Sequence, residues 1–292
     1  MITTNSLLND IIFPTFWKDE WKTHFLSQLM LVQLEKRQIQ VLYDGGGWLD
    51  RHRITLNLLR QAAELCNMDL VKRFFVFTGD DYSPGVITPW NLLTTVGTRE
   101  VKDTVLPDFS SFEWHEAGVT NFESYRHEMI NFSHDCANEN RVIDKAYWRG
   151  STQQHQSRKL FYDLVKDHSS FDVQDSDGQS NFREMKYVGE YSVLVDLPGQ
   201  GYSGRLKHLL FSGRPVVVYP RSAWDWVTLN LEPNVHFYLA QMSHIDLANS
   251  CINLLHSLEH RRFFVENCFE KLKLMEKSTM IFATVKIIQK CD

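Results

Sequence analysis

Residues 191–219 constrain the fold more than any other part of the chain. They contain a strand-like run over residues 191–197, a glycine-containing turn, a helical segment that begins near Ser203, and a valine-rich strand that ends at Tyr219. Two strands joined by a crossover helix form a parallel βαβ unit, and ligands bind beyond the carboxyl ends of such strands. The pattern therefore predicts an α/β fold with a ligand at the turn that follows the first strand.

The turn in this unit has residues that suit a phosphate ligand. Gly199 and Gly201 would let a ligand come close to the backbone. Ser203 is a natural helix N-cap, and Arg205 falls in the expected first helical turn. The two side chains would occupy the same places in a helix that binds nothing. However, an arginine near the positive end of a helix is unfavourable unless an anion lies there, so we predict a phosphate or diphosphate site.

A second stretch repeats the order of strand, glycine turn, hydroxyl and helix. An aromatic strand over residues 145–151 ends in Arg-Gly-Ser, and a helix expected over residues 156–165 carries Arg158 in its first turn. Two cations placed in this way could hold one diphosphate between them.

Two acids follow an earlier strand. The buried, aromatic run over residues 74–78 leads directly into Asp80 and Asp81. A strand fixes the residues at its carboxyl end, while the following loop leaves them facing solvent or a ligand, so these acids are candidates for catalysis. Acids in such loops also serve as plain turn formers, and that alternative stays open.

A third acidic pattern suggests a metal but also has a simpler interpretation. Asp175 and Asp177 follow a strand with one residue between them, as in many sugar-nucleotide transferases that hold a divalent ion. The surrounding polar residues equally suit a solvated loop, and we expect no metal here.

The rest of the chain alternates helices, strands and loops. Residues 7–36 have the pattern of an amphipathic helix, and the polar residues 138–141 would suit a hinge between domains. Further elements are a strand over residues 38–43, a helix over 54–66, a helix over 121–131, a short helix from 222, a strand over 234–240, and helices over 245–260, about 263–273 and about 279–290.

Composition limits the class of protein. A chain of 292 residues with 43% hydrophobic residues is long enough for two domains with real cores. The formal net charge of −5 argues against nucleic acid as the main partner. The five cysteines are widely spread without a Cys-x-x-Cys pair, so we expect reduced thiols. Without a long apolar run or a secretory signal, we expect no membrane span, no secretion and a cytoplasmic location.

These motifs together resemble a known family. Residues 148–151 (Trp-Arg-Gly-Ser) with Arg158, and Gly199, Ser203, Arg205, Lys207 and His208 with the Ser-Gly pair at 212–213, are similar to glycosyltransferase family 90. This family is of the capsule-associated-protein type and includes the protein O-glucosyltransferases (Rumi type) and small viral enzymes that build capsid glycans. The likeness extends into residues 224–226, 231–233 and 235–237 and covers about residues 38–275.

The resemblance implies a GT-B-like fold, with two Rossmann-type domains, a cleft between them and a C-terminal helical tail that crosses back. The first domain would comprise residues 1–140 with the helices of about 263–292, and would hold the acceptor and the base. The second, residues 141–262, would hold the UDP-sugar. The resemblance implies an inverting enzyme without a metal or other cofactor that transfers xylose, or as second choice glucose, to a glycan or glycoprotein. A metal-dependent transferase and an inactive glycan-binding module are the alternatives.

The resemblance also assigns roles to individual residues. Asp81 would be the catalytic base, with Asp80 as second choice. Apart from the resemblance, Trp114 and His115 are weak candidates for the acceptor site, and a packing role for them is an equal alternative. The predicted UDP-sugar-binding residues are Arg149, Gly150, Ser151, Arg158, Gly199, Gly201, Tyr202, Ser203 and Arg205.

The chain departs from the family pattern in two respects. We expect none of the signal peptide, disulfides and endoplasmic-reticulum retention tail of the secreted eukaryotic members, which favours a viral or bacterial type of enzyme and, if viral, the host cytoplasm. Thr152 also stands where several relatives have another arginine, so fewer diphosphate contacts are expected.

Overall fold

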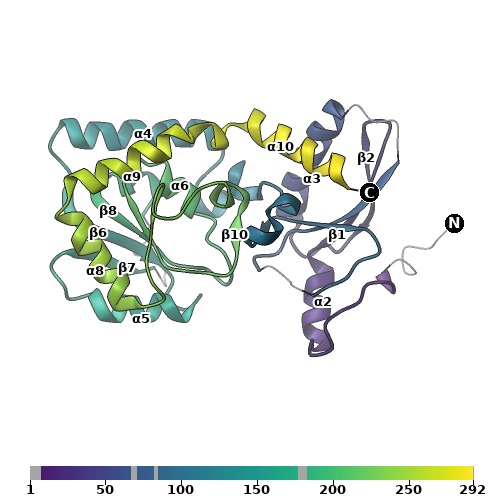
Figure 1. Ribbon diagram of the computed structural model, residues 1–292, viewed down its shortest axis with the longest axis horizontal. Coiled ribbons are helices and arrows are strands. Elements are labelled where there is room, and N and C mark those ends of the chain that lie inside the picture. Colours follow the sequence, from purple (N-terminus) through teal and green to yellow (C-terminus); the bar gives the residue numbers. More distant parts are fainter. Residues whose placement is uncertain (1–7, 67–70, 82–84, 177–182, 292) are drawn as a thin grey trace. The chain divides into compact units, whose positions relative to one another are not determined.

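The computed structural model describes residues 8–66, 71–81, 85–176 and 183–291. Contacts between residues divide the chain into two compact units, and Figure 1 shows the elements of both. Unit 1 is Met1–Ser111 with Ala223–Trp226 and Lys277–Asp292, and unit 2 is Phe112–Ser222 with Val227–Glu276.

A four-stranded mixed sheet forms the centre of unit 1. Its strand order is β2-β1-β3-β4; β1 runs antiparallel to β2 and β3, and β3 runs parallel to β4. The short strand β10 pairs antiparallel with β5 in the same unit. The elements are α2 (Asp19–Ser27), β1 (Leu29–Glu35), β2 (Gln38–Asp44), α3 (Leu49–Leu65), β3 (Lys72–Phe77), β4 (Asn91–Thr94), β5 (Val96–Gly97), the 3₁₀ helices η1 (Arg99–Thr104) and η2 (Phe109–Ser111), β10 (Trp224–Asp225) and α10 (Lys277–Lys290).

Strand β1 is covered on both faces. Met30 and Val32 pack with apolar residues of α3 and α10, whereas Leu29 and Leu31 pack with Phe25 of α2 and with β3. The predicted helix over residues 7–36 is therefore wrong for β1. A strand buried on both faces is apolar at almost every position, and periodicity alone does not separate such a run from a buried helix.

A five-stranded parallel sheet forms the centre of unit 2, which makes this unit Rossmann-like. Its strand order is β11-β9-β8-β6-β7, with parallel pairing throughout, so the predicted βαβ unit is confirmed. The elements are η3 (His115–Ala117), α4 (Phe122–Asn138), β6 (Ile143–Gly150), α5 (Gln156–Val165), β7 (Phe171–Asp175), η5 (Met185–Glu190), β8 (Tyr191–Asp196), α6 (Leu206–Leu210), β9 (Val216–Val218), α7 (Trp226–Leu229, which begins at the boundary with unit 1), β11 (Tyr238–Leu239), α8 (His244–Leu255), α9 (Leu258–Glu270) and η6 (Leu272–Met275).

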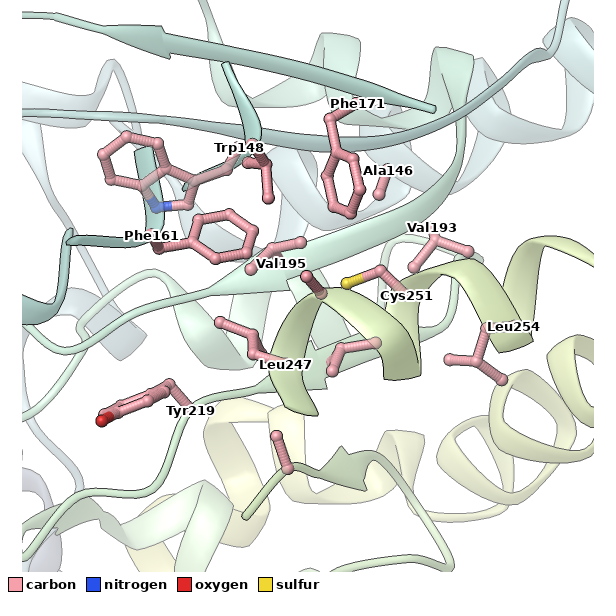
Figure 2. Packing of buried hydrophobic residues seen from close by; sticks show 14 of the residues in the cluster. Ala146, Trp148, Phe161, Phe171, Val193, Val195, Tyr219, Leu247, Cys251 and Leu254 are labelled. Carbon is pink, nitrogen blue, oxygen red and sulfur yellow. The ribbon is translucent and has the colours of Figure 1, made fainter. Parts of the chain in front are cut away.

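Helices α5 and α8 cover one face of this parallel sheet. Figure 2 shows the packing: Trp148 of β6 lies near Phe161 of α5, and Cys251 of α8 lies close to Val193 and Val195 of β8. All five side chains are buried. This core fixes the directions of β6 and β8, and therefore the positions of the residues at their carboxyl ends.

The strand order places a topological switch point between β6 and β8. From β6 the chain first adds β7 on one side and then adds β8, β9 and β11 on the other. The connections leave the sheet in opposite directions there, which opens a crevice beyond the carboxyl ends of the two strands. A ligand site is expected at this crevice.

The last helices belong to different units. Helix α10 packs on α3 through Val285 and Ile288 in unit 1, whereas α9 belongs to unit 2 (Figure 1). Helix α4 also belongs to unit 2 by its contacts, although it precedes residue 140. The functional domain limits expected from the sequence stay predictions. No helix in the described ranges has both the length and the hydrophobicity that a membrane span requires.

Candidate functional site

A cavity of about 150 Å³ lies at the switch point of unit 2. Arg149 from the end of β6 and Arg205 from the turn before α6 line it, together with Arg183. Tyr147 and Trp114 contribute aromatic walls. Cations beside flat apolar surfaces suit a ligand that combines an anionic group with rings.

Arg149 and Arg205 are in direct contact. The Nη1 of Arg205 donates a hydrogen bond to the carbonyl oxygen of Arg149. Their side chains are 18% and 20% exposed, so both are largely withdrawn from solvent. Arg149 Nε and Arg205 Nη2 are buried and have no hydrogen-bond partner among the described residues. Unmet donors beside a cavity are unusual in folded proteins and indicate a place where a ligand supplies acceptors.

Asp196, the last residue of β8, holds the cluster together. Its carboxylate is fully buried, accepts hydrogen bonds from Ser203 Oγ (2.8 Å) and Arg205 Nε (3.2 Å), and pairs with Arg221 Nη2 at 2.6 Å. Two guanidinium groups share this one carboxylate, so a positive charge remains. Asp196 and Arg221 were missed in the sequence; the only signal was an acid at the end of an otherwise apolar strand.

Arg149 has a weaker counter-charge. Its Nη2 lies 3.9 Å from Asp172 Oδ1 on the neighbouring strand β7, while Tyr191 Oη donates to the other oxygen of that carboxylate at 2.6 Å. Asp172 thus orients Arg149 without a close ion pair. The guanidinium keeps most of its capacity to bind an anion.

Unit 1 positions Asp80 and Asp81 directly after β3. Arg51 of α3 holds Asp80 through both carboxylate oxygens, at 2.7 and 3.4 Å. The guanidinium carbon of Arg51 lies 4.3 Å from the ring centre of Trp48 and 4.5 Å from that of Phe109. The two rings therefore fix the position of the Arg51 side chain, and the carboxylate of Asp80 is engaged in the ion pair with it.

Asp81 differs from its neighbour. It is exposed and has no hydrogen-bond or ion-pair partner among the described residues. Nearby protein atoms nevertheless desolvate its carboxyl in part; this, followed by the negative charge of Asp80, raises the pKa of Asp81 above its ordinary value. A raised pKa makes a carboxylate a stronger base.

The sequence matches one family model, described as Glycosyl transferase family 90, over residues 56–262. The chain belongs to this family. It is therefore a glycosyltransferase, an enzyme with a sugar donor and an acceptor. A search of curated proteins found no match. The matched part contains Asp81 and the arginines of the cavity, whereas Arg51 and α10 lie outside it.

In this glycosyltransferase, Ser203 does not have the expected position. Helix α6 begins at Leu206, with Arg205 at its N-cap and no side-chain cap, so the predicted capping by Ser203 is wrong. Its hydroxyl donates to Asp196 instead, because that buried carboxylate needs a third donor. The positive charge of the site therefore comes from guanidinium groups and not from the start of this short helix.

Arg158 connects the two glycine turns of the glycosyltransferase. It is 7% exposed, and its nitrogens donate to the carbonyl oxygens of Pro198 (2.7 Å) and Ser151 (3.2 Å) and to Gln154 Oε1 (2.8 Å). These contacts tie the turn after β8 to the turn after β6. A direct contact of Arg158 with phosphate stays a prediction.

The turn after β8 is closely packed. Gly199 N donates to the carbonyl oxygen of Tyr202 at 3.0 Å, and a Cβ on Gly199 would lie 2.9 Å from that oxygen. The turn thus needs a glycine at this position. Gly201 and Tyr202 are buried, and Gly150 lies next to Arg158 in the other turn. Their contacts with a donor stay predictions.

Trp114 and His115 differ in their surroundings. Trp114 lines the same cavity as Arg149 and Arg205, with its ring centre 6.1 Å from that of His208. His115 is 56% exposed and lies 3.3 Å from a carboxylate oxygen of Glu113. The structure thus groups Trp114 with the arginine cavity, and the acceptor role of either residue stays a prediction.

Of the two acids considered for a metal, Asp175 has a different role in the structure. Both oxygens of Asp175 accept hydrogen bonds from Thr152, one from the amide at 3.1 Å and one from the hydroxyl at 2.6 Å. This clamp joins β7 to the turn after β6. Asp177 lies outside the described residues. Within the described part of the chain, no group of three potential ligand side chains has the geometry of a metal site.

We predict that Asp196→Asn destabilises the protein by roughly 3–5 kcal/mol, because the change leaves two largely buried guanidinium groups without their counter-charge. Urea denaturation followed by circular dichroism measures the difference. Asp163→Asn, which removes exposed pairs with Lys159 and Lys166, is the control and should cost far less. Equal losses in the two variants would contradict the organising role of Asp196.

Proposed function

We propose that this family 90 glycosyltransferase inverts the anomeric centre while it moves a sugar from a UDP-sugar to a hydroxyl of a glycan or glycoprotein, without a metal. The observation that carries the proposal is the pair Arg149 and Arg205 in a cavity at the switch point of a parallel sheet. Ligand phosphates bind at this place in open α/β sheets.

The charge of the cavity suits a departing nucleoside diphosphate. The leaving group gains negative charge in the transition state, and fixed cations that face it lower the barrier. Arg205 is already oriented by Asp196, so little reorganisation is needed when that charge develops. Tyr147 and Trp114 offer ring surfaces on which the base of the nucleotide can pack.

Asp81 is the proposed general base. The acceptor hydroxyl must lose a proton as it attacks the sugar, and a free carboxylate with a raised pKa is suited to take it. Asp80 is held by Arg51 and would have to leave that pair first. One base and a single displacement are enough for inversion, and the proposal includes a GT-B-like pairing of acceptor-binding unit 1 with donor-binding unit 2.

The sugar preference rests on the resemblance to small viral members of the family. Xylose is the first choice and glucose the second. Asp175 is engaged by Thr152 through both oxygens, which favours a metal-free reaction over a metal-dependent one. The reaction is proposed for the cytoplasm, of the host if the enzyme is viral.

The donor is tested by incubating the enzyme with UDP-xylose, UDP-glucose, UDP-galactose and UDP-N-acetylglucosamine and measuring released UDP. We expect the fastest UDP release with UDP-xylose or, as the second choice, with UDP-glucose. The rate of release should not change when a chelator is added. Activity that disappears with the chelator and returns with Mn²⁺ would overturn the metal-free mechanism. Glycan binding without turnover of any donor would identify an inactive binding module.

We predict that Asp81→Asn lowers the transfer rate by roughly 10²–10⁴-fold, because the base is removed while the donor site is unchanged. Affinity for UDP, measured by calorimetric titration, should stay close to that of the wild type. Asp80→Asn is the matched control and should affect transfer far less. A larger effect at Asp80, or an equal loss of UDP affinity in Asp81→Asn, would show that the base is assigned wrongly.

We also predict that Arg51→Met shifts the acid limb of the kcat/KM profile upward by about 1 pH unit. Without its guanidinium partner, the charge of Asp80 acts fully on Asp81 and raises the pKa of Asp81 further. The base acts when deprotonated, so activity is then lost at a higher pH as the pH falls. Arg53→Met, on the exposed face of the same helix, should leave the limb in place. If the maximum of kcat/KM falls but the acid limb of its pH profile stays at the same pH, Arg51 has only a structural role.

A further inference from the structure

Unit 2 has a second cavity, at the amino-terminal ends of the strands of its sheet. It has a volume of about 260 Å³ and is lined by Val142 before β6, Ser192 near the start of β8 and Pro215 before β9, with residues of α9 on its other side. The arginine cavity described above lies at the other ends of β6 and β8. The two cavities have no lining residue in common.

Arg214 lines this second cavity and has no acidic partner among the described residues. Its Nε donates to the carbonyl oxygen of Gly189 at 2.9 Å, and its Nη2 donates to the carbonyl oxygens of Gly189 (2.7 Å) and Ser133 (3.0 Å). Burial, and then the positive charge of Arg261, lower the pKa of Arg214. In contrast, Arg51 and Arg205 each contact a carboxylate.

Two further arginines reach the cavity from α9. Arg261 lies 3.3 Å from Asp144, a carboxylate that is 70% exposed and therefore a weak partner, and its buried Nε has no hydrogen-bond partner among the described residues. Arg262 is exposed. Glu266 is the acid in the lining. Together with Asp144, the partner of Arg261, it gives two carboxylates for three guanidinium groups, so one positive charge is in excess.

The remaining wall is apolar. Leu258 and Val265 of α9 face the cavity together with Val142 and Pro215. The volume lies just below the range of about 300–1,000 Å³ that is usual for pockets of drug-sized ligands, so a sugar-sized ligand fits it. A simple ion would leave the apolar wall without a partner.

We propose that this cavity binds a small organic anion, in which a phosphate or carboxylate group contacts Arg214, Arg261 and Arg262 and a sugar-sized body packs on the apolar wall. The site is separate from the donor cavity and does not depend on the proposed donor chemistry. Its ligand contacts the beginnings of β6 and β8, the strands whose carboxyl ends border the donor cavity.

Calorimetric titration of the full chain at constant ionic strength tests the site, with glucose 1-phosphate, glucuronate and inorganic phosphate as probes. We expect one of the two organic anions to bind more tightly than inorganic phosphate; glucose 1-phosphate as the tighter one identifies a phosphate ligand, and glucuronate a carboxylate ligand. The double variant Arg261→Gln, Arg262→Gln should lower that affinity at least about tenfold, as expected for the loss of two charge-assisted contacts.

The matched control is the double variant Arg149→Gln, Arg205→Gln, which removes cations from the donor cavity. It should bind the organic anion as the wild type does. Binding that is lost in this control and kept in the Arg261, Arg262 variant would place the anion in the donor cavity and overturn the proposal. Absence of binding of all three probes to the wild type would overturn it as well.

Discussion

The buried carboxylate of Asp196 is the interaction on which the site depends. A carboxylate without solvent contact is costly unless it is paired, and here Ser203, Arg205 and Arg221 provide the partners. The pairing fixes Arg205 beside Arg149 but does not neutralise the cluster. The structure therefore holds positive charge at the carboxyl ends of β6 and β8, where we propose that the phosphates of a donor bind.

The topology of unit 2 determines the position of these charged residues. Because β6 and β8 are neighbours whose connections leave in opposite directions, their carboxyl ends border an open crevice, and Arg149 and Asp196 lie at those ends. Arg158 then ties the two following turns together. In unit 1, Arg51 plays a comparable part, since it engages Asp80 and leaves Asp81 available.

Local patterns predicted part of the fold, and non-local contacts account for much of what they missed. The βαβ unit over residues 191–219 could be predicted because strand, turn and helix signals follow one another directly. Strand β1 was missed because burial on both faces removes the alternation that marks a strand. The motifs predicted that Arg149 and Arg205 lie close together, as they do in the cavity, while their contact with phosphate stays a prediction. The role of Asp196 could not be predicted, because it depends on Arg221, which is distant in sequence and meets it only in the folded sheet.

A crystal structure of the enzyme with UDP tests the central claim most directly. The account predicts diphosphate oxygens within hydrogen-bond distance of the guanidinium groups of Arg149 and Arg205, with the ion pairs of Asp196 unchanged. A diphosphate bound elsewhere, with both arginines in contact only with protein, would contradict it.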